Sequence, residues 1–178
     1  RKNEIAFILC KVLLRYNGMM DEDNVHSILD GGNEISVMRL FHYLRVNQGQ
    51  GQGQGDKDIL GSSAHTDWGM MTLILQDGVG GLEYLAREDG QWHNVPCRPG
   101  TLVVNGGDFL SLLHPDYHSP IHRVLSPTTQ DRFSFVFFFY PNFSTPMKQK
   151  SIEKFVTITK EEENHEGNKR SFEFNTLL

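Results

Sequence analysis

The chain has 178 residues, of which 38% are hydrophobic and 22% charged, a composition typical of one globular domain and not of a disordered segment. Its net charge of -5 argues against the basic surface that nucleic acids or anionic membranes require. No hydrophobic stretch approaches the roughly 20 residues of a membrane-spanning helix. Cys10 and Cys97 are too few for a disulfide framework and fit a reducing compartment, so we expect a cytoplasmic location.

The first 36 residues predict helices. Over residues 2–15 the hydrophobic residues follow the spacing of an amphipathic helix: Ile5, Ile8, Leu9, Val12 and Leu13. Asp21 is a candidate cap for a second short helix that ends at Leu29. Because the sequence opens at Arg1 inside the first helical pattern, we expect residues 1–36 to be the end of a longer N-terminal region.

From residue 37 to residue 147 the pattern favours strands. Short runs rich in β-branched and aromatic residues alternate with Gly, Pro and Asp turns, and the clearest runs span residues 37–46, 70–76, 82–86, 101–104 and 132–140. In total we expect about eight short strands, which favours a sandwich or a barrel. The expected fold is therefore mainly β with flanking helices, around a jelly-roll (double-stranded β-helix) core.

Two segments lie outside this pattern. Residues 47–55 alternate Gly with Gln, and a glycine-rich segment binds phosphate only where it opens a helix after a strand, so we predict a flexible loop. Residues 148–178 predict a C-terminal tail with one short helix, for which Thr159 and Glu162 form a possible capping box. The final segment, 172–174, is expected to dock back on the core.

His65 and Asp67 are candidate metal ligands, since side chains two residues apart on a strand point to the same face. A third ligand would come from the downstream histidines, which are His93, His114, His118 and His122. His122 is the best candidate because it lies at the head of an expected strand, whereas Pro115 disfavours the helix that would pair His114 with His118. Two His and one Asp form the facial triad of non-haem Fe(II) oxygenases.

Arg132 and Ser134 lie two residues apart on the following strand, which places them on one face. A guanidinium beside a hydroxyl is a good receptor for a carboxylate. A salt bridge that closes a hairpin would also explain Arg132 alone, and the phenylalanines of this strand are expected in the core. An arginine that faces such a core needs an anionic partner, which a dicarboxylic co-substrate chelating the metal would provide.

The order and spacing of these segments resemble the iron(II)/2-oxoglutarate-dependent dioxygenase superfamily, in its isopenicillin-N-synthase-like branch. The similarity runs from about Met38 to Met147 and is carried by residues 64–67, 80–83, 99–108, 119–124 and 132–134. It implies a jelly-roll core, with His65, Asp67 and His122 as iron ligands. By the same matching, Arg132 and Ser134 would bind the far carboxylate of 2-oxoglutarate.

Tyr43 falls on the tyrosine that assists 2-oxoglutarate binding in this family. The sequence departs from the family's strand pattern at Phe41, where Asn is common, and at Leu44, where Pro is usual. With Phe41 in place of Asn, the polar co-substrate contact that the resemblance implies at this position is missing.

The resemblance implies an enzyme that couples oxidative decarboxylation of 2-oxoglutarate to oxidation of a small organic substrate by O2, with hydroxylation as the default outcome. The cofactors would be Fe2+ and 2-oxoglutarate, with ascorbate as a further candidate reductant. Two other classes stay open: a zinc hydrolase that uses the same triad to activate water, and a non-enzymatic metal-sensing or ligand-sensing jelly roll. A hydrolase would leave Arg132 and Ser134 unexplained and lacks an evident general base beside the triad. The sequence predicts neither the substrate nor the oligomeric state.

Overall fold

The structure is a computed structural model that describes residues 2–16, 25, 28–29, 34–47, 59–113, 116–142 and 145. Two compact units are present, Arg1–Thr145 and Pro146–Leu178, and every described residue belongs to the first. The predicted Gly-Gln loop beyond residue 47, the capping-box helix and the docking of residues 172–174 lie outside the described residues. Among the described helices, none has the length and hydrophobicity to span a membrane.

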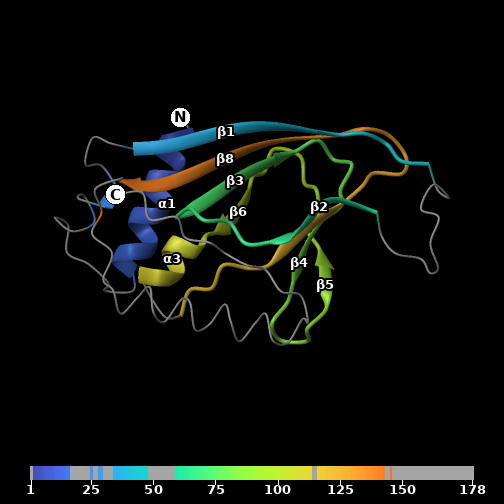
Figure 1. The fold of residues 1–178 in the computed structure, drawn as a ribbon. Coiled ribbons are helices and arrows are strands. Elements are labelled where there is room, and N and C mark those ends of the chain that lie inside the picture. Colours follow the sequence, from blue (N-terminus) through green and yellow to red (C-terminus); the bar gives the residue numbers. More distant parts are fainter. Residues whose placement is uncertain are drawn as a thin grey trace, which may run out of the picture. The chain divides into compact units, whose positions relative to one another are not determined.

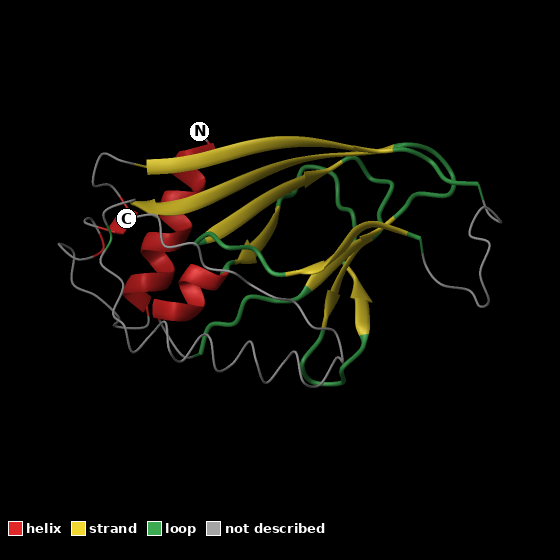
Figure 2. Cartoon of the chain, viewed as in Figure 1, coloured by secondary structure: helices red, strands yellow, loops and turns green. Residues whose placement is uncertain are grey.

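Eight described strands form two four-stranded antiparallel sheets (Figures 1 and 2). The first sheet has the order β1 (Glu34–Tyr43), β8 (Arg132–Asn142), β3 (Met71–Gln76) and β6 (Val103–Gly106). The second has the order β2 (Leu60–His65), β7 (His122–Leu125), β4 (Leu82–Leu85) and β5 (Trp92–Asn94). Along the chain the strands alternate between the two sheets, except that β4 and β5 are neighbours in one sheet. This arrangement confirms the predicted jelly roll.

Strand β8 pairs with β1 on one side and β3 on the other, so it lies in the middle of the first sheet. Its first residues alternate between buried and exposed, with Arg132 and Ser134 buried and Phe133 and Phe135 exposed. This alternation follows from the pleat of a strand. The prediction that the phenylalanines belong to the core is therefore wrong for Phe133 and Phe135, although it holds for Phe139 and its neighbour at position 137.

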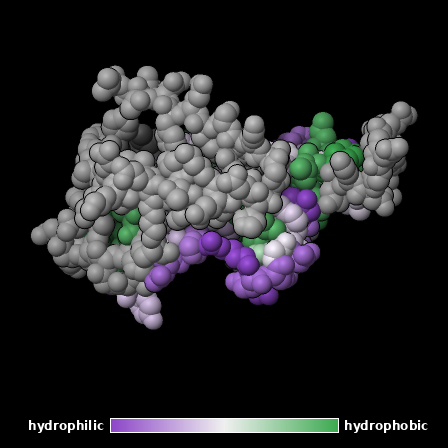
Figure 3. All heavy atoms as spheres, turned by 60° about the horizontal axis from the view of Figure 1, so that its bottom comes forward, coloured by the Kyte–Doolittle hydropathy of each residue, from purple (hydrophilic) through white to green (hydrophobic). Residues whose placement is uncertain are grey.

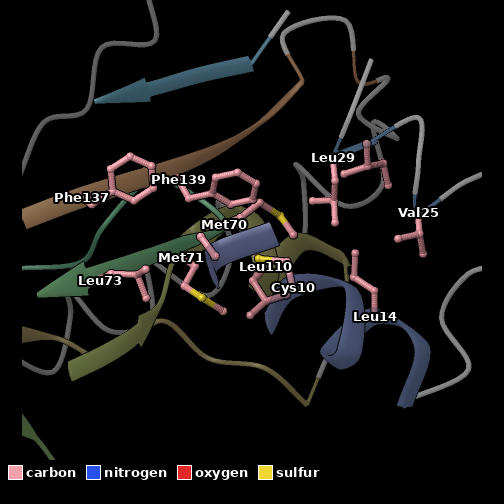
Figure 4. Close-up of a cluster of buried hydrophobic side chains, with 12 residues drawn as sticks. Cys10, Leu14, Val25, Leu29, Met70, Met71, Leu73, Leu110, Phe137 and Phe139 are labelled. Atoms are coloured by element: carbon pink, nitrogen blue, oxygen red, sulfur yellow. The ribbon is translucent and has the colours of Figure 1, made fainter. Parts of the chain in front are cut away.

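Two helices, α1 (Lys2–Tyr16) and α3 (Asp108–Leu113), contribute to the largest hydrophobic cluster. Figure 4 shows Cys10 and Leu14 of α1 with Leu110 of α3 beside Met71 of β3 and Phe139 of β8. The predicted helix over residues 2–15 is confirmed, but α3 was not predicted. Burial in this cluster raises the pKa of the Cys10 thiol to about 12, which keeps it protonated.

The buried side of α1 differs from the prediction. Ala6, Cys10 and Leu14 are fully buried, whereas Ile8 and Val12 are more than half exposed. Helical spacing alone could not choose between these sides, because α1 carries hydrophobic residues on both. Small side chains such as Ala6 and Cys10 let the helix approach its neighbours closely, which explains why this side faces the core.

Several element boundaries also differ from the prediction. Strand β1 begins at Glu34 instead of Val37, and β6 covers residues 103–106 instead of 101–104. Val25, Ile28 and Leu29 are buried in the cluster that α1 completes, and the rest of the predicted second helix lies outside the described residues. The three-part division at residues 36 and 147 stays a prediction.

A part of the first sheet carries exposed large hydrophobic side chains from all four of its strands. They are Met38 and Leu40 of β1, Phe133 and Phe135 of β8, Leu75 of β3 and Val104 of β6, each between 38% and 62% exposed. Register places them on one face of the sheet, the same face that α1 covers elsewhere. On the face shown in Figure 3, by contrast, a hydrophilic band runs along one edge and hydrophobic surface gathers in separate groups.

Candidate metal centre

The structure brings the three predicted metal ligands together. His65 ends β2 and His122 begins β7, and the two residues are direct partners in the strand register, with ring centroids 4.3 Å apart. The carboxylate of Asp67 lies 3.9 Å from Nε2 of His65 and 3.7 Å from Nε2 of His122. One ligand atom from each residue fits within 4.8 Å of the others. Two nitrogens and one oxygen at this spacing can hold a divalent ion and leave part of its coordination sphere open.

Both histidines are oriented by a backbone carbonyl two residues earlier. Nδ1 of His65 lies 2.7 Å from the oxygen of Ser63, and Nδ1 of His122 lies 3.2 Å from the oxygen of Pro120. A carbonyl only accepts hydrogen bonds, so Nδ1 carries the proton and the lone pair of Nε2 faces the centre. Burial lowers the pKa of His122 against the opposing effect of the Asp67 charge, which favours the neutral ring that binds metal.

Asp67 does not lie on a strand, contrary to the prediction. Strand β2 ends at His65, and Asp67 belongs to the loop that follows, where its side chain is 5% exposed. Nδ2 of Asn105 donates to Oδ2 of Asp67 at 2.8 Å, and the backbone N–H of Asp108 donates to the carbonyl of Asp67 at 2.7 Å. These hydrogen bonds, and not strand alternation, turn the carboxylate toward the histidines.

The loop after β2 packs tightly on the end of β6. Thr66 donates through Oγ1 to Oδ2 of Asp108 at 3.0 Å. At Gly107, an added Cβ would lie 2.0 Å from the carbonyl oxygen of Gly69 and 2.9 Å from that of Asp67. Only glycine therefore fits at position 107, since any side chain would displace the backbone that carries Asp67.

Two of the other candidate histidines, His93 and His118, are described and lie apart from this centre. His93 lies in β5, is exposed, and pairs with Asp89 at 2.8 Å. His118 is exposed in the loop before β7. His114 lies outside the described residues. His122 is thus the downstream histidine that the structure brings to His65 and Asp67.

Arg132 shares a pocket with the triad and is 1% exposed. Its Nη2 donates to Oε1 of Gln76 at 3.0 Å, its Nη1 donates to Oγ of Ser134 at 3.4 Å, and its guanidinium carbon lies 5.0 Å from the ring centroid of Tyr43. Nε of Arg132 has no partner. Among the described residues no carboxylate forms an ion pair with this arginine, so the hairpin salt bridge considered from the sequence is absent there. A buried cation that contacts only neutral groups calls for an anion from outside the protein.

Tyr43, to which the family resemblance gives a part in 2-oxoglutarate binding, lies beside this arginine. Burial raises the pKa of Tyr43, while the charge of Arg132 and hydrogen bonds with Arg132 and Ser134 act in the opposite direction. The neutral phenol can therefore donate a hydrogen bond at physiological pH. Phe41 also lines the pocket, so the polar group that the family often has at this position is absent.

The sequence profile of the 2OG-Fe(II) oxygenase superfamily matches residues 34–141, which include both sheets and the whole site. The chain belongs to this superfamily.

Curated relatives agree with this assignment. The protein named clavatol oxidase claD from Penicillium crustosum is 39% identical over 126 residues, or 70% of this chain and 36% of that protein. The 2-oxoglutarate-dependent dioxygenase citB from Monascus ruber is 50% identical over 84 residues, or 47% of this chain and 26% of that protein. The chain thus spans only about a quarter to a third of the length of these relatives.

Solved oxygenase structures share the fold. JOX2 in complex with 2OG, Fe and JA superposes with a TM-score of 0.68 at 29% identity, covering 83% of this chain and 42% of JOX2. A full-length Neurospora crassa protein in complex with alpha-KG and 5-formyluracil gives a TM-score of 0.64 at 27% identity, covering 84% of this chain and 50% of that protein. Iron and 2-oxoglutarate are the cofactors of this superfamily, as predicted. The isopenicillin-N-synthase-like branch and the use of ascorbate stay predictions.

Sequence reasoning missed three polar residues of the oxygenase pocket and its surroundings. Asn105 holds Asp67, Gln76 holds Arg132, and the Thr72 side chain lines the pocket. Each occurs in or beside a hydrophobic strand. A polar residue on the buried side of a strand requires a partner, so its presence there was the available signal of a role. The partners of Asn105 and Gln76 lie 38 and 56 residues away in sequence, and the Thr72 hydroxyl has no partner among the described residues, so the signal could not identify a role.

Proposed function

We propose that this protein is a non-haem Fe(II)- and 2-oxoglutarate-dependent dioxygenase that oxidises a small organic substrate, with hydroxylation as the default reaction. One observation carries the proposal: a buried arginine without a carboxylate partner among the described residues shares a pocket with a His-Asp-His cluster. In this proposal His65, Asp67 and His122 bind the iron. Arg132, Ser134 and Tyr43 bind the far carboxylate of 2-oxoglutarate.

The donor set fits the metal. Two neutral imidazoles and one carboxylate suit Fe(II) and leave positions for exogenous ligands. When bound, iron with 2-oxoglutarate and O2 supplies the oxidising chemistry. The protein's own residues position the reactants: Arg132 fixes one end of the co-substrate, and Asn105 fixes the carboxylate of Asp67. Hydrophobic residues such as Ile74 and Val136 form part of the pocket wall.

The substrate class is supported by the relatives. One is named for clavatol, and the Neurospora crassa protein has also been solved with thymine, and both are small organic molecules. The proposed partners are therefore such a molecule and O2, and the proposed location is cytoplasmic.

The metal-dependent hydrolase is less favoured. A hydrolase needs a general base beside its metal-bound water. Among the described residues that line the pocket, Asp67 is the sole carboxylate, and it belongs to the triad. Arg132 and Ser134 are buried in the pocket at the end away from the metal cluster, and a hydrolase would have no use for them.

The test is iron-dependent formation of succinate from 2-oxoglutarate by the purified protein. We expect wild type loaded with Fe2+ to form succinate, and His122→Ala to lose both this turnover and most metal binding. His118→Ala is the matched control, because His118 is exposed and lies outside the cluster, and it should behave as wild type. Iron-loaded protein that binds 2-oxoglutarate without turning it over would favour the sensor. Absence of 2-oxoglutarate binding would reject the proposal.

A further inference from the structure

Thr72 is buried in the pocket without a hydrogen-bond partner. Its side chain is 1% exposed, and its Oγ1 is one of the few described buried polar atoms that no protein group satisfies. A buried hydroxyl without a partner costs free energy, so a native protein rarely keeps one unless a ligand or water completes it. The Nε of Arg132 is a second such atom in the same pocket.

These two unsatisfied groups mark different ends of the pocket. In the register of the first sheet, Thr72 pairs with Asn105 on β6, and Asn105 donates to Asp67 of the metal cluster. Gln76, which accepts from Arg132, lies four residues further along β3 on the same face, about 13 Å away at the rise of a strand. Thr72 therefore belongs to the metal end, and Arg132 to the far end.

We propose that Thr72 is a co-substrate-binding residue, whose hydroxyl donates a hydrogen bond to the end of 2-oxoglutarate that chelates the metal. A ligand with oxygen atoms at both ends satisfies both unpartnered groups at once, which a monocarboxylate held only by Arg132 does not. This inference rests on the proposed function, since it needs the same pocket to accept a dicarboxylate. Phe41 pairs with Ser134 in the strand register and so belongs to the Arg132 end of the pocket, whereas the proposed contact of Thr72 lies at the metal end.

The experiment measures three quantities for wild type, Thr72→Val and Thr72→Ser: 2-oxoglutarate affinity of the metal-loaded protein, metal affinity, and the melting temperature without ligand. Valine has the shape of threonine but no hydroxyl. We expect Thr72→Val to bind 2-oxoglutarate about tenfold more weakly or worse, because a hydrogen bond to a charged group is lost. Thr72→Ser should restore most of the affinity.

The same substitution should not reduce stability in the ligand-free protein, since valine removes an unsatisfied buried hydroxyl. Metal affinity should stay within about threefold of wild type. Thr128→Val is the matched control, because it makes the same chemical change at an exposed position outside the pocket lining, and it should keep 2-oxoglutarate affinity.

Three results would overturn the inference: unchanged 2-oxoglutarate affinity in Thr72→Val, a parallel loss of metal affinity, or a clearly lower melting temperature without ligand. The last would mean that the hydroxyl already has a partner inside the protein. Failure of wild type to bind 2-oxoglutarate would instead reject the proposed function itself, and this inference with it.

Discussion

Asn105 should control metal affinity although it is not a ligand. Its amide donates to Asp67 at 2.8 Å, and the two residues are 8% and 5% exposed, so water cannot replace this bond readily. A hydrogen bond to a buried charged group contributes roughly 1.5–3 kcal/mol. Loss of a residue that orients a metal ligand commonly weakens metal binding by about 10–100-fold. We therefore expect Asn105→Ala to bind Fe2+ about 10–100-fold more weakly than wild type.

Two comparisons separate the hydrogen bond from packing. Asn105→Leu keeps a side chain of similar size but has no donor, so it should lose metal affinity as Asn105→Ala does. Asn94→Ala is the matched control, because Asn94 is exposed on β5, and its metal affinity should equal that of wild type.

The assay is a metal titration under anaerobic conditions, with the melting temperature of each metal-free variant measured in parallel. If Asn105→Leu keeps wild-type metal affinity while Asn105→Ala loses it, the space that Asn105 fills matters and the hydrogen bond does not. If both variants bind Fe2+ as wild type does, Asp67 is oriented by the backbone of its loop alone, and the reasoning fails.

Two further predictions concern the far end of the pocket and the loop that carries Asp67. Arg132→Ala should weaken 2-oxoglutarate binding by about 3–5 kcal/mol, several hundred-fold or more, and Arg132→Lys should restore it only in part, because an ammonium lacks the two-pronged geometry of guanidinium. Titration of the iron–co-substrate absorption band measures this, and wild-type binding by Arg132→Ala would contradict the co-substrate assignment. Gly107→Ala should cost about 3 kcal/mol or more of unfolding free energy and weaken metal binding, whereas Gly106→Ala, whose Cβ would approach only Leu110 at 3.4 Å, should cost much less. Denaturant unfolding of both glycine variants checks this, and equal losses would show that the close approach to Gly69 is relieved cheaply.

The metal cluster and the arginine end could be predicted from sequence because their residues occur together in a recognisable arrangement. Each group alone has an ordinary structural explanation, but the order and spacing of the segments that carry them resembled a known family. His65, Asp67, His122 and Arg132 accordingly lie in one pocket of the structure. The iron-binding and co-substrate-binding roles of these residues stay predictions until the tests above are made.

The local cause of the Asp67 position could not be predicted. Strand alternation was the basis for pairing it with His65, yet the strand ends at His65 and the pair is made by contacts from the segment around Asn105, 38 residues away in sequence. Contacts of this kind depend on how the sheets pack, which spacing does not report. The prediction of the buried side of α1 was wrong for a related reason. Helical periodicity identifies the hydrophobic sides of a helix but does not indicate which of them faces the core.

The exposed hydrophobic side chains on the first sheet have a practical consequence for handling the protein. Six large hydrophobic side chains on one face of four neighbouring strands are each between 38% and 62% exposed. Contiguous hydrophobic patches promote association, and sulfate or phosphate strengthens that tendency because such salts are excluded from protein surfaces. Purification by salting-out and storage in phosphate buffer should therefore favour aggregates of this chain. Dilute, low-salt buffers should keep it monodisperse, which the affinity measurements above require.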